Sequence, residues 1–396
     1  MARAYAADQG LGIEWVRFRW PELSADLEAG LFDLVVSGVT VRPDRSVTGR
    51  FSLPLATSAA VLLVPADSPL QKPSDLDRVD LRLAVNAGGH LERVARRLFP
   101  EARIDAVGAN ADVLPRLLRK EVDGVVSDSV EAPLWQRASD RPLRTIGPLT
   151  RDHKAAWFPP GDEERIRSFD RWLIAAESSG LLDRLRERAG LARVATARPV
   201  AALLSSLDER LSLMPAIARA KRVLGIPIED RAREDRVLRS AAAAVARASV
   251  EAGQAPPDPV VVETLFRTQI EAAKWIQRQT LADSAESPIT TPEELASRRR
   301  AARHRLDRSL RPALIHLGNR IAMLLVASMG DPSPPPDPDD VARALARHGL
   351  PDSRLRALHR ALAATLTSGR TAGPDHPRQR AAPGTRTIGS ARRAPP

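Results

Sequence analysis

The stretch Gln269-Ile270-Glu271-Ala272-Ala273-Lys274-Trp275-Ile276-Gln277 decides how the second half of the chain is interpreted. It lies late in a run from Pro259 to Leu281 in which apolar residues recur at helical spacing. Gln277 falls on the apolar stripe itself, because Phe266, Ile270, Ala273 and Gln277 follow one another at intervals of four, three and four residues. A buried amide needs a hydrogen-bond partner, so Gln277 is either a satisfied core residue or a group that meets a ligand.

The composition excludes several classes of function. The chain has 396 residues, 43% of them hydrophobic, which is enough for more than one domain. Without cysteine there can be no disulfide, thiolate metal site or cysteine nucleophile, and no pair among the 7 histidines has zinc-ligand spacing. No apolar run reaches the ~18 to 20 residues of a membrane span, and no signal-peptide core follows Met1. The net charge of +11 is arginine spread along the chain, which hints at small anionic ligands rather than nucleic acid.

Strand and helix patterns alternate through residues 1–190, which predicts an α/β domain with a mainly parallel sheet and ligands at the carboxyl ends of its strands. Strands are expected at 12–18, 32–36, 60–64, 81–85, 104–107, 124–126 and 154–158. Helices are expected at 3–9, 20–27, 88–99, 113–118, 131–137 and 163–177. The loop 37–45 carries Ser37, Thr40 and Arg45, which together can form an anion-binding cup.

The order of these segments resembles the two-lobed periplasmic solute-binding proteins of the polar amino-acid type, and among them the cyclohexadienyl (prephenate/arogenate) dehydratases. The resemblance implies that Thr40 and Arg45 hold a ligand carboxylate, and that Asp128 and Glu131 form the acidic site of the second lobe. Glu131 would be the general acid of a dehydratase, since shielding in a cleft can raise the pKa of a carboxyl group. Asp128 and Glu131 can equally serve as a helix cap and a first-turn carboxylate, and Arg45 as a surface charge.

Three features depart from the dehydratase pattern. His90-Leu91 stand where relatives have Thr-Asn, Ala156 stands where a tyrosine is expected, and the first strand of the family would lie before Met1. We therefore expect slow prephenate dehydration or none. The resemblance implies a periplasmic protein. With Met1 as the true start the protein would instead be cytoplasmic, whereas a start codon assigned too late would explain both the missing signal and the missing strand.

After a predicted linker at 191–200 the strand pattern disappears, and residues 201–330 predict an all-helical bundle. Its helices are expected at 201–224, 229–252, 259–281 and 293–329, with a kink at Pro215 and an N-cap at Asp230. Residues 331–367 would add two accessory helices, at 339–347 and 352–367. Residues 368–396 have the composition of a disordered tail.

Each of the four bundle helices directs a cation or an amide toward the apolar interior. These residues are Arg210 and Lys221 on the first helix, Arg233 and Glu234 on the second, Gln277 on the third and Arg320 on the fourth. Arg210 and Lys221 share a face because eleven residues make about three turns. Buried cations rarely lack an anionic partner, so a dianionic ligand would complete the site. Any single arginine can instead be a solvated surface charge, and Lys221 can compensate a helix dipole.

This set, together with Pro227-Ile228-Glu229-Asp230 and Asn319, resembles the active site of the secreted, all-helical chorismate mutases over residues 201–330. The resemblance implies an isomerase of aromatic amino acid biosynthesis that converts chorismate to prephenate without a metal or cofactor, and a homodimer. Lys221 and Gln277 would donate to the ether oxygen and Glu234 would accept from the ring hydroxyl. The two carboxylates would be bound by Arg210, Arg233 and Arg320. Ala273 departs from the hydroxyl residue common in relatives. The alternative is a solute-binding protein for an amino acid or an aromatic carboxylate, with an inactive helical domain.

Overall fold

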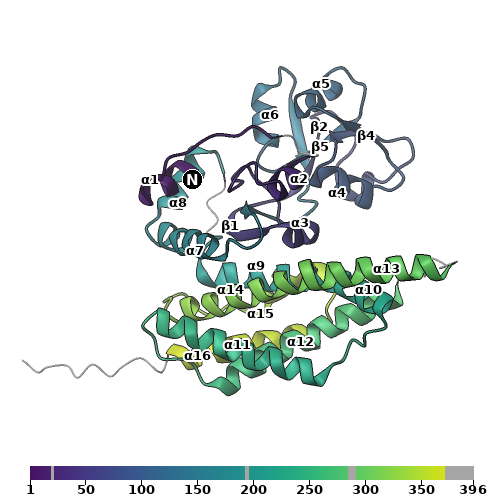
Figure 1. The fold of residues 1–396 in the computed structure, drawn as a ribbon. Coiled ribbons are helices and arrows are strands. Elements are labelled where there is room, and N and C mark those ends of the chain that lie inside the picture. Colours follow the sequence, from purple (N-terminus) through teal and green to yellow (C-terminus); the bar gives the residue numbers. More distant parts are fainter. Residues whose placement is uncertain (19–21, 192–195, 284–290, 371–396) are drawn as a thin grey trace, which may run out of the picture.

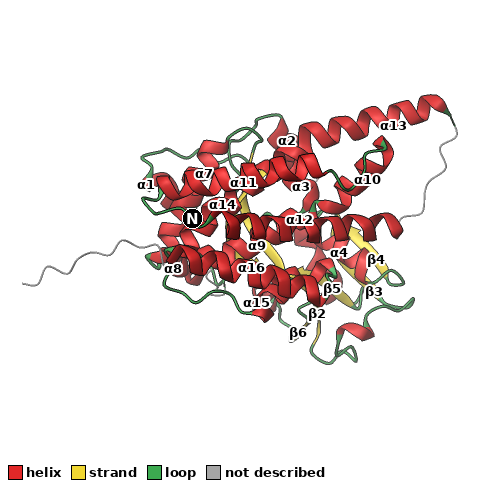
Figure 2. Ribbon diagram, turned by 90° about the horizontal axis from the view of Figure 1, so that it is seen from below, coloured by secondary structure: helices red, strands yellow, loops and turns green. Residues whose placement is uncertain are grey.

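The computed structural model describes residues 1–18, 22–191, 196–283 and 291–370, which form two lobes and a helical bundle (Figures 1 and 2). The first lobe contains the chain up to Ser58 and again from Asp152 to Leu191, and the second lobe contains the residues between. The bundle begins at Pro199 and lies against the first lobe. The predicted disordered tail falls almost wholly outside the described residues.

The second lobe is built on a five-stranded sheet with the order β4-β3-β5-β2-β6. Its strands are β2 (Ala60–Pro65), β3 (Arg82–Asn86), β4 (Arg103–Val107), β5 (Gly124–Asp128) and β6 (Leu143–Ile146), and its helices are η1 (Pro73–Asp75), α4 (His90–Leu98), η2 (Asn110–Asp112), α5 (Val113–Leu118) and α6 (Ala132–Ala138). Strand β3 pairs parallel with β4 and β5, but β2 pairs antiparallel with β5 and β6. The sheet is therefore mixed, not mainly parallel, because alternation of segment types does not encode the direction of β2 and β6, which join this lobe to the first.

The first lobe has a sheet of only two strands, β1 (Arg50–Ser58) and β7 (Asp152–Phe158), which pair antiparallel. Its helices are α1 (Ala2–Asp8), α2 (Leu23–Glu28), α3 (Pro43–Thr48), α7 (Glu163–Ser178) and α8 (Leu181–Arg188). The strand expected at 12–18 is absent, and the one expected at 32–36 is reduced to a bridge from Val35 to Trp157. Strand β1 was not predicted because it contains Pro54, which lies at a register shift in the ladder, where a strand tolerates proline.

The bundle follows the predicted helices closely. It consists of α9 (Pro199–Ser212), α10 (Met214–Leu224), α11 (Arg231–Glu251), α12 (Pro259–Ala282), α13 (Pro292–Arg305), the π-helix η3 (Leu306–Leu310), α14 (Arg311–Met329), α15 (Pro338–Leu345), η4 (Ala346–His348) and α16 (Asp352–Arg370). Asp230 caps α11 by accepting a hydrogen bond from the Arg233 amide at 3.0 Å. Helix α13 buries none of its side chains and projects beyond the other helices (Figure 1).

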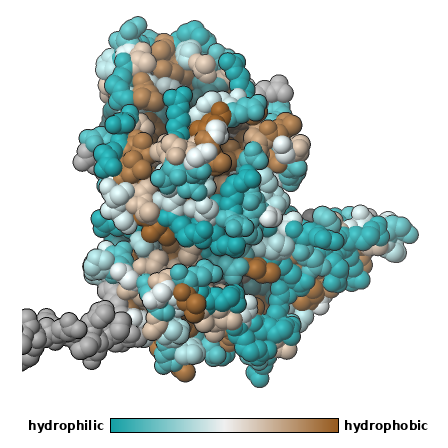
Figure 3. Space-filling model, turned by 60° about the vertical axis from the view of Figure 1, so that its left-hand side comes forward, coloured by the Kyte–Doolittle hydropathy of each residue, from teal (hydrophilic) through white to brown (hydrophobic). Residues whose placement is uncertain are grey.

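One helical stretch among the described residues, Pro292–Met329, is long and apolar enough to cross a membrane by length and composition alone. The tested window is 61% buried inside the protein, and α14 packs against α9 and α11. A core helix therefore accounts for its hydrophobicity. The face of the molecule in Figure 3 is predominantly hydrophilic, with hydrophobic residues scattered among polar ones.

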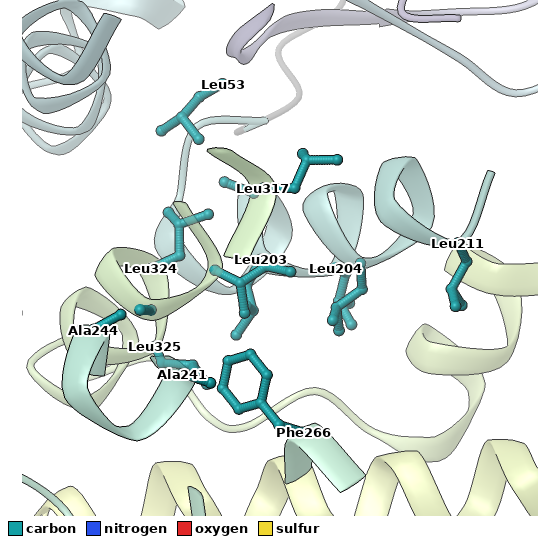
Figure 4. Close-up of a cluster of buried hydrophobic side chains, with 14 of the residues drawn as sticks. Leu53, Leu203, Leu204, Leu211, Ala241, Ala244, Phe266, Leu317, Leu324 and Leu325 are labelled. Carbon is teal, nitrogen blue, oxygen red and sulfur yellow. The ribbon is translucent and has the colours of Figure 1, made fainter. Parts of the chain in front are cut away.

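The first lobe and the bundle share one hydrophobic core. Leu53 of β1 lies above Leu317 of α14 and Leu203 of α9, and the same cluster continues to Phe266 of α12 (Figure 4). The chain between these two parts is also held in place, as far as it is described. Thr196 donates from Oγ1 to the Pro54 carbonyl at 2.8 Å, and the Ala197 amide donates to Glu177 at 2.9 Å. The end of the expected linker is therefore packed rather than free.

Asp170 of α7 is a buried carboxyl group on the first-lobe side of this interface. It accepts a hydrogen bond from the Leu53 amide at 2.7 Å. Burial raises its pKa from the ordinary value of 3.8 to about 7, although nearby Arg320 acts in the opposite direction. Glu209 and Glu163 also lie close enough to raise it.

We predict that Asp170 makes the free energy of unfolding fall as the pH rises from about 4 to about 7. In this window the folded state binds a proton that the unfolded state has released, because the folded pKa is the higher one. Three pKa units correspond to at most about 4 kcal/mol. Urea denaturation at several pH values should show a shallower decline for Asp170→Asn than for the native protein. Identical declines would contradict the prediction.

Candidate functional sites

The bundle encloses a pocket of about 290 Å³ whose walls are apolar and whose polar groups are mainly cationic or amide. Its polar lining residues are Arg210, Lys221, Asp230, Arg233, Glu234, Ser240, Lys274, Gln277, Arg311 and Asn319. The apolar lining includes Met214, Ile217, Phe266 and Ile270. Five of the six bundle residues predicted from spacing therefore lie around one cavity.

Two of the cations in this pocket are held by backbone carbonyl groups. Lys221 donates from Nζ to the Ile228 carbonyl at 3.0 Å, and Arg210 donates from Nη1 to the Leu314 carbonyl at 3.1 Å. Each ion therefore keeps further N–H groups for a ligand. Because the side chains are fixed at one end by main-chain oxygen atoms, they point into the pocket without an acidic partner in these bonds.

Burial and mutual repulsion act on the pocket cations. Burial lowers the pKa of Arg210 to about 10, so the group stays charged at neutral pH. Burial, followed by the charge of Arg233, lowers the pKa of Lys221, although Asp230 and Glu234 oppose this. Burial and then Arg311 lower the pKa of Arg233. A ligand with two negative charges would relieve this repulsion.

Gln277 is buried, with only 5% of its surface exposed. Its Nε2 lies 3.6 Å from the sulfur of Met214, a weak acceptor, and its Oε1 has no hydrogen-bond partner. The two ends of an amide are assigned rather than observed, and a half-turn exchanges them. Gln277 is therefore not a satisfied core amide, and it can donate into the pocket.

Lys274 is a pocket residue that the sequence analysis did not select, although it lies in the stretch that opened it. Its Nζ is 3.2 Å from Glu234 Oε2 and 2.5 Å from Glu271 Oε1. Glu234 thus serves partly to neutralise Lys274. The spacing of three residues between Glu271 and Lys274 is that of an ordinary helix ion pair, so the sequence gives no separate signal that the lysine lies in the pocket wall.

Arg320, which was expected at this site, lies instead at the interface between the bundle and the first lobe. It pairs with Glu209 and donates to the Phe51 carbonyl at 2.8 Å and the Ser52 carbonyl at 3.3 Å. Helix α14 contributes Arg311 to the pocket in its place. The two arginines are nine residues apart, about two and a half helical turns, so they face opposite sides.

A larger cleft of about 690 Å³ separates the two lobes. All four residues predicted for the first domain, Thr40, Arg45, Asp128 and Glu131, line it. Arg45 is buried and donates from Nη1 to the Thr40 carbonyl at 3.3 Å. It lies in α3, whereas a loop was expected there. Burial and then the charge of Arg42 lower its pKa to about 10.

The acidic side of the cleft is crowded with hydrogen-bond donors. Lys154 lies 3.1 Å from Asp128 Oδ2 and donates to Thr40 Oγ1 at 3.0 Å. Asp128 Oδ1 accepts from the amides of Val130 and Glu131, both at 2.9 Å, so it also caps the turn before α6. Glu131 accepts from Asn110 at 2.6 Å and from Ser127 at 3.0 Å. Burial raises its pKa, as a proton donor requires.

The departures from the dehydratase pattern fall in different places. Leu91 lines the cleft, so the amide that relatives have there is missing from the wall. Ala156 is fully buried in the core shared with the bundle and does not line the cleft. His90 also lines the cleft, 3.0 Å from Asp152. In the described part of the chain no cluster of three or more histidine or acidic residues suits a metal ion.

Comparison with known proteins agrees with this division of the chain. Residues 1–191 match the family of bacterial extracellular solute-binding proteins, family 3, and residues 201–278 match chorismate mutase type II. The cyclohexadienyl dehydratase of Pseudomonas aeruginosa is 29% identical over 186 residues, which are 46% of this chain and 69% of that protein. A probable histidine-binding protein of Neisseria gonorrhoeae is 26% identical over 195 residues, 47% of this chain and 70% of that protein. The crystal structure of the ancestral amino acid-binding protein AncCDT-1, a precursor of cyclohexadienyl dehydratase, is 28% identical, has a TM-score of 0.45, and covers 47% of this chain and 82% of its own.

The chain is thus a fusion of a family 3 solute-binding domain with an all-helical domain of the chorismate mutase type II family. Its helical domain is a chorismate mutase, an isomerase whose substrate is chorismate. The resemblances drawn from the sequence are confirmed over residues 1–191 and 201–278.

We predict that Arg311, rather than Arg320, contributes to substrate binding. Removing a hydrogen bond to a charged group costs about 1.5–3 kcal/mol, so Arg311→Met should raise KM for chorismate by about 10- to 100-fold. The matched control is Arg308→Met, one turn earlier and exposed to solvent. Steady-state kinetics on both variants test this, and an unchanged KM in Arg311→Met would remove Arg311 from the site.

Proposed function

We propose that the bundle pocket catalyses the rearrangement of chorismate to prephenate with the residues gathered there. The observation that supports this most directly is the convergence of Arg210, Lys221, Arg233 and Arg311 on one small apolar cavity. Arg311 pairs with Asp307, and Glu234 already pairs with Lys274. Asp230 is then the one other acid in the described pocket lining for Arg210, Lys221 and Arg233. A substrate with two carboxylates supplies the missing charge.

The reaction is pericyclic, so no proton is transferred and no covalent intermediate forms. The pocket has two tasks: to hold the folded conformation of the substrate and to stabilise charge on the ether oxygen as its C–O bond breaks. Lys221 and Gln277 are the proposed donors to that oxygen. Arg210, Arg233 and Arg311 would bind the carboxylates, where the planar guanidinium favours two parallel bonds. Glu234 would accept a hydrogen bond from the ring hydroxyl while keeping its contact with Lys274.

A decrease in chorismate absorbance with the purified full chain tests this function directly. The intact protein is required, because an excised bundle would expose the leucines that pack against the first lobe. No loss of chorismate above the uncatalysed rate would leave the competing interpretation, a solute-binding protein with an inactive helical domain.

We predict that Lys221→Ala lowers kcat by about 100-fold or more, as removal of a preorganised donor to a developing oxyanion does. Gln277→Ala should be milder, because a neutral donor is weaker than a charged one. Arg219→Ala, on the same helix but exposed, is the control. Circular dichroism establishes that each variant is folded. A folded Lys221→Ala protein with near-native kcat would show that this lysine does not reach the ether oxygen.

Prephenate dehydration is a second candidate activity, located in the cleft between the lobes. In its favour, Glu131 lines the cleft and burial raises its pKa. Against it, both Glu131 oxygens accept hydrogen bonds, from Asn110 and Ser127, which favours the ionised form. The wall also carries Leu91, which offers no hydrogen bond to a polar ring.

We therefore predict that the protein converts prephenate to phenylpyruvate slowly or not at all. Each unmet hydrogen bond at a buried polar group costs about 1–3 kcal/mol, or about 5- to 150-fold in rate. The alkaline absorbance of phenylpyruvate after addition of prephenate measures the reaction. Rapid formation that is abolished in Glu131→Gln would make the protein bifunctional instead.

The proposal also includes an oligomeric state and a cellular compartment. The resemblance to helical chorismate mutases supports a homodimer. Solute-binding proteins of family 3 are usually periplasmic, which supports the same location for this protein.

A further inference from the structure

Helix α3 lies between the cleft of the solute-binding domain and the pocket of the mutase domain. Arg45 of this helix lines the cleft. The next residue, Ser46, donates from Oγ to Glu209 Oε1 at 2.8 Å, and both side chains are buried. Glu209 in turn precedes Arg210, which lines the mutase pocket. One hydrogen bond therefore separates the chain segments that carry the two sites.

A second set of contacts also connects α3 to the mutase pocket. Helix α3 packs against η3 and α14, the segments that supply Leu306, Arg311 and Leu314 to the pocket wall. The Leu314 carbonyl accepts the hydrogen bond from Arg210. A displacement of α3 would therefore reach the mutase pocket both through α9 and through α14.

Further contacts hold both ends of this connection, α3 and Glu209, in place. The indole of Trp157 donates to the Arg45 carbonyl at 3.1 Å, which ties α3 to β7. Glu209 is held by Arg320, which also donates to the Phe51 carbonyl of β1. Closely packed interiors shift between discrete arrangements rather than absorb a displacement locally, so movement at one end is transmitted.

We propose that the cleft between the lobes is an effector site, and that an α-amino acid with an apolar side chain bound there changes the activity of the mutase pocket through α3 and the Ser46–Glu209 hydrogen bond. This inference rests on the mutase function proposed above. It gives the first domain a regulatory role that requires no chemistry in the cleft.

The lining of the cleft defines the class of ligand. Arg45, beside Thr40, offers a site for a carboxylate. Asp128 and Glu131 face it from the second lobe and can accept from an ammonium group. The rest of the lining includes the apolar residues Trp15, Val36, Leu55 and Leu91, together with polar residues such as Asn86, His90 and Lys154, which pairs with Asp128. An α-amino acid with an aromatic or aliphatic side chain fits this order of charges and surfaces.

The probes are L-phenylalanine and L-leucine, added to the full chain. Calorimetry measures their binding, and chorismate consumption with and without a saturating amino acid measures the response of the mutase. We expect at least one of the two to bind and to change kcat/KM by about fivefold or more, the usual lower range of coupling between sites. A bicyclic dicarboxylate that mimics the transition state should, by linkage, change the Kd of the amino acid by the same factor as the amino acid changes the Kd of the mimic.

The variant Ser46→Ala tests the route of the coupling. It should bind the amino acid, but the ratio of its mutase rates with and without the amino acid should fall to one, whatever its unliganded rate. The matched control is Thr48→Ala on the same helix, whose hydroxyl donates to the Asp44 carbonyl at 3.2 Å within α3 itself. This control should respond like the native protein. Amide hydrogen exchange of α9 tests the same route in the native protein, without a variant. The protection of amides near Glu209 should change when the amino acid binds.

The possible failures are distinguishable. An active mutase whose rate is unchanged while calorimetry shows the amino acid bound would overturn the inference and leave the proposed function intact. Absence of binding by both probes, a full response in Ser46→Ala, or unchanged exchange in α9 would overturn it as well. Loss of all chorismate turnover, with or without amino acid, would instead remove the proposed function and the regulation together.

Discussion

The buried ion pair between Arg320 and Glu209 is the contact on which the arrangement of the two domains depends. Removing two charges from water costs several kcal/mol for each ion, and the interior repays this only where the remaining donors and acceptors are satisfied. Here the first lobe satisfies most of them: the Phe51 and Ser52 carbonyls accept from Arg320, and Ser46 donates to Glu209, while Arg320 Nε has no partner among the described residues. Separating the bundle from the lobe would leave both ions without these partners.

The hydrophobic core also shows that the first lobe and the bundle depend on each other. A two-stranded sheet such as β1 and β7 is marginal by itself and needs a second layer to cover its apolar face. Helices α9 and α14 provide part of that layer, where Leu53 meets Leu203 and Leu317 (Figure 4). The second lobe differs in this respect, because its five-stranded sheet has a hydrophobic cluster on each face that involves no bundle residue. The first lobe and the bundle therefore share one core, and the second lobe, with cores of its own, is attached through the connections at β2 and β6.

Sequence periodicity predicted the bundle and most of its pocket because helical geometry is local. The interval of eleven residues between Arg210 and Lys221 fixes a shared face whatever the rest of the chain does. Arg320 was predicted for the pocket and Arg311 was not considered. Both lie on helical stretches with apolar neighbours, and only the packing of α14 against the first lobe decides which of them reaches the pocket. The prediction of a mainly parallel sheet was wrong for the same reason, because the antiparallel pairing of β2 with β5 and β6 is a long-range property. In the cleft, Arg45, Asp128 and Glu131 were found through the resemblance, whereas periodicity alone could not bring residues of two lobes together.

The interface between the first lobe and the bundle also matters for the proposed catalysis. A site that works by electrostatic stabilisation needs donors that are already in place, because reorientation during the reaction would cancel the gain. Arg210 follows Glu209 on α9, and Glu209 is immobilised by Arg320 and Ser46. Helix α14, which carries Arg311 and Leu314, packs against α3 of the first lobe. Two walls of the mutase pocket are thus anchored by residues of the solute-binding domain, which makes that domain part of the preorganisation of the active site. In the proposed mechanism these are groups whose position determines the rate, so a ligand that displaces α3 would act on them.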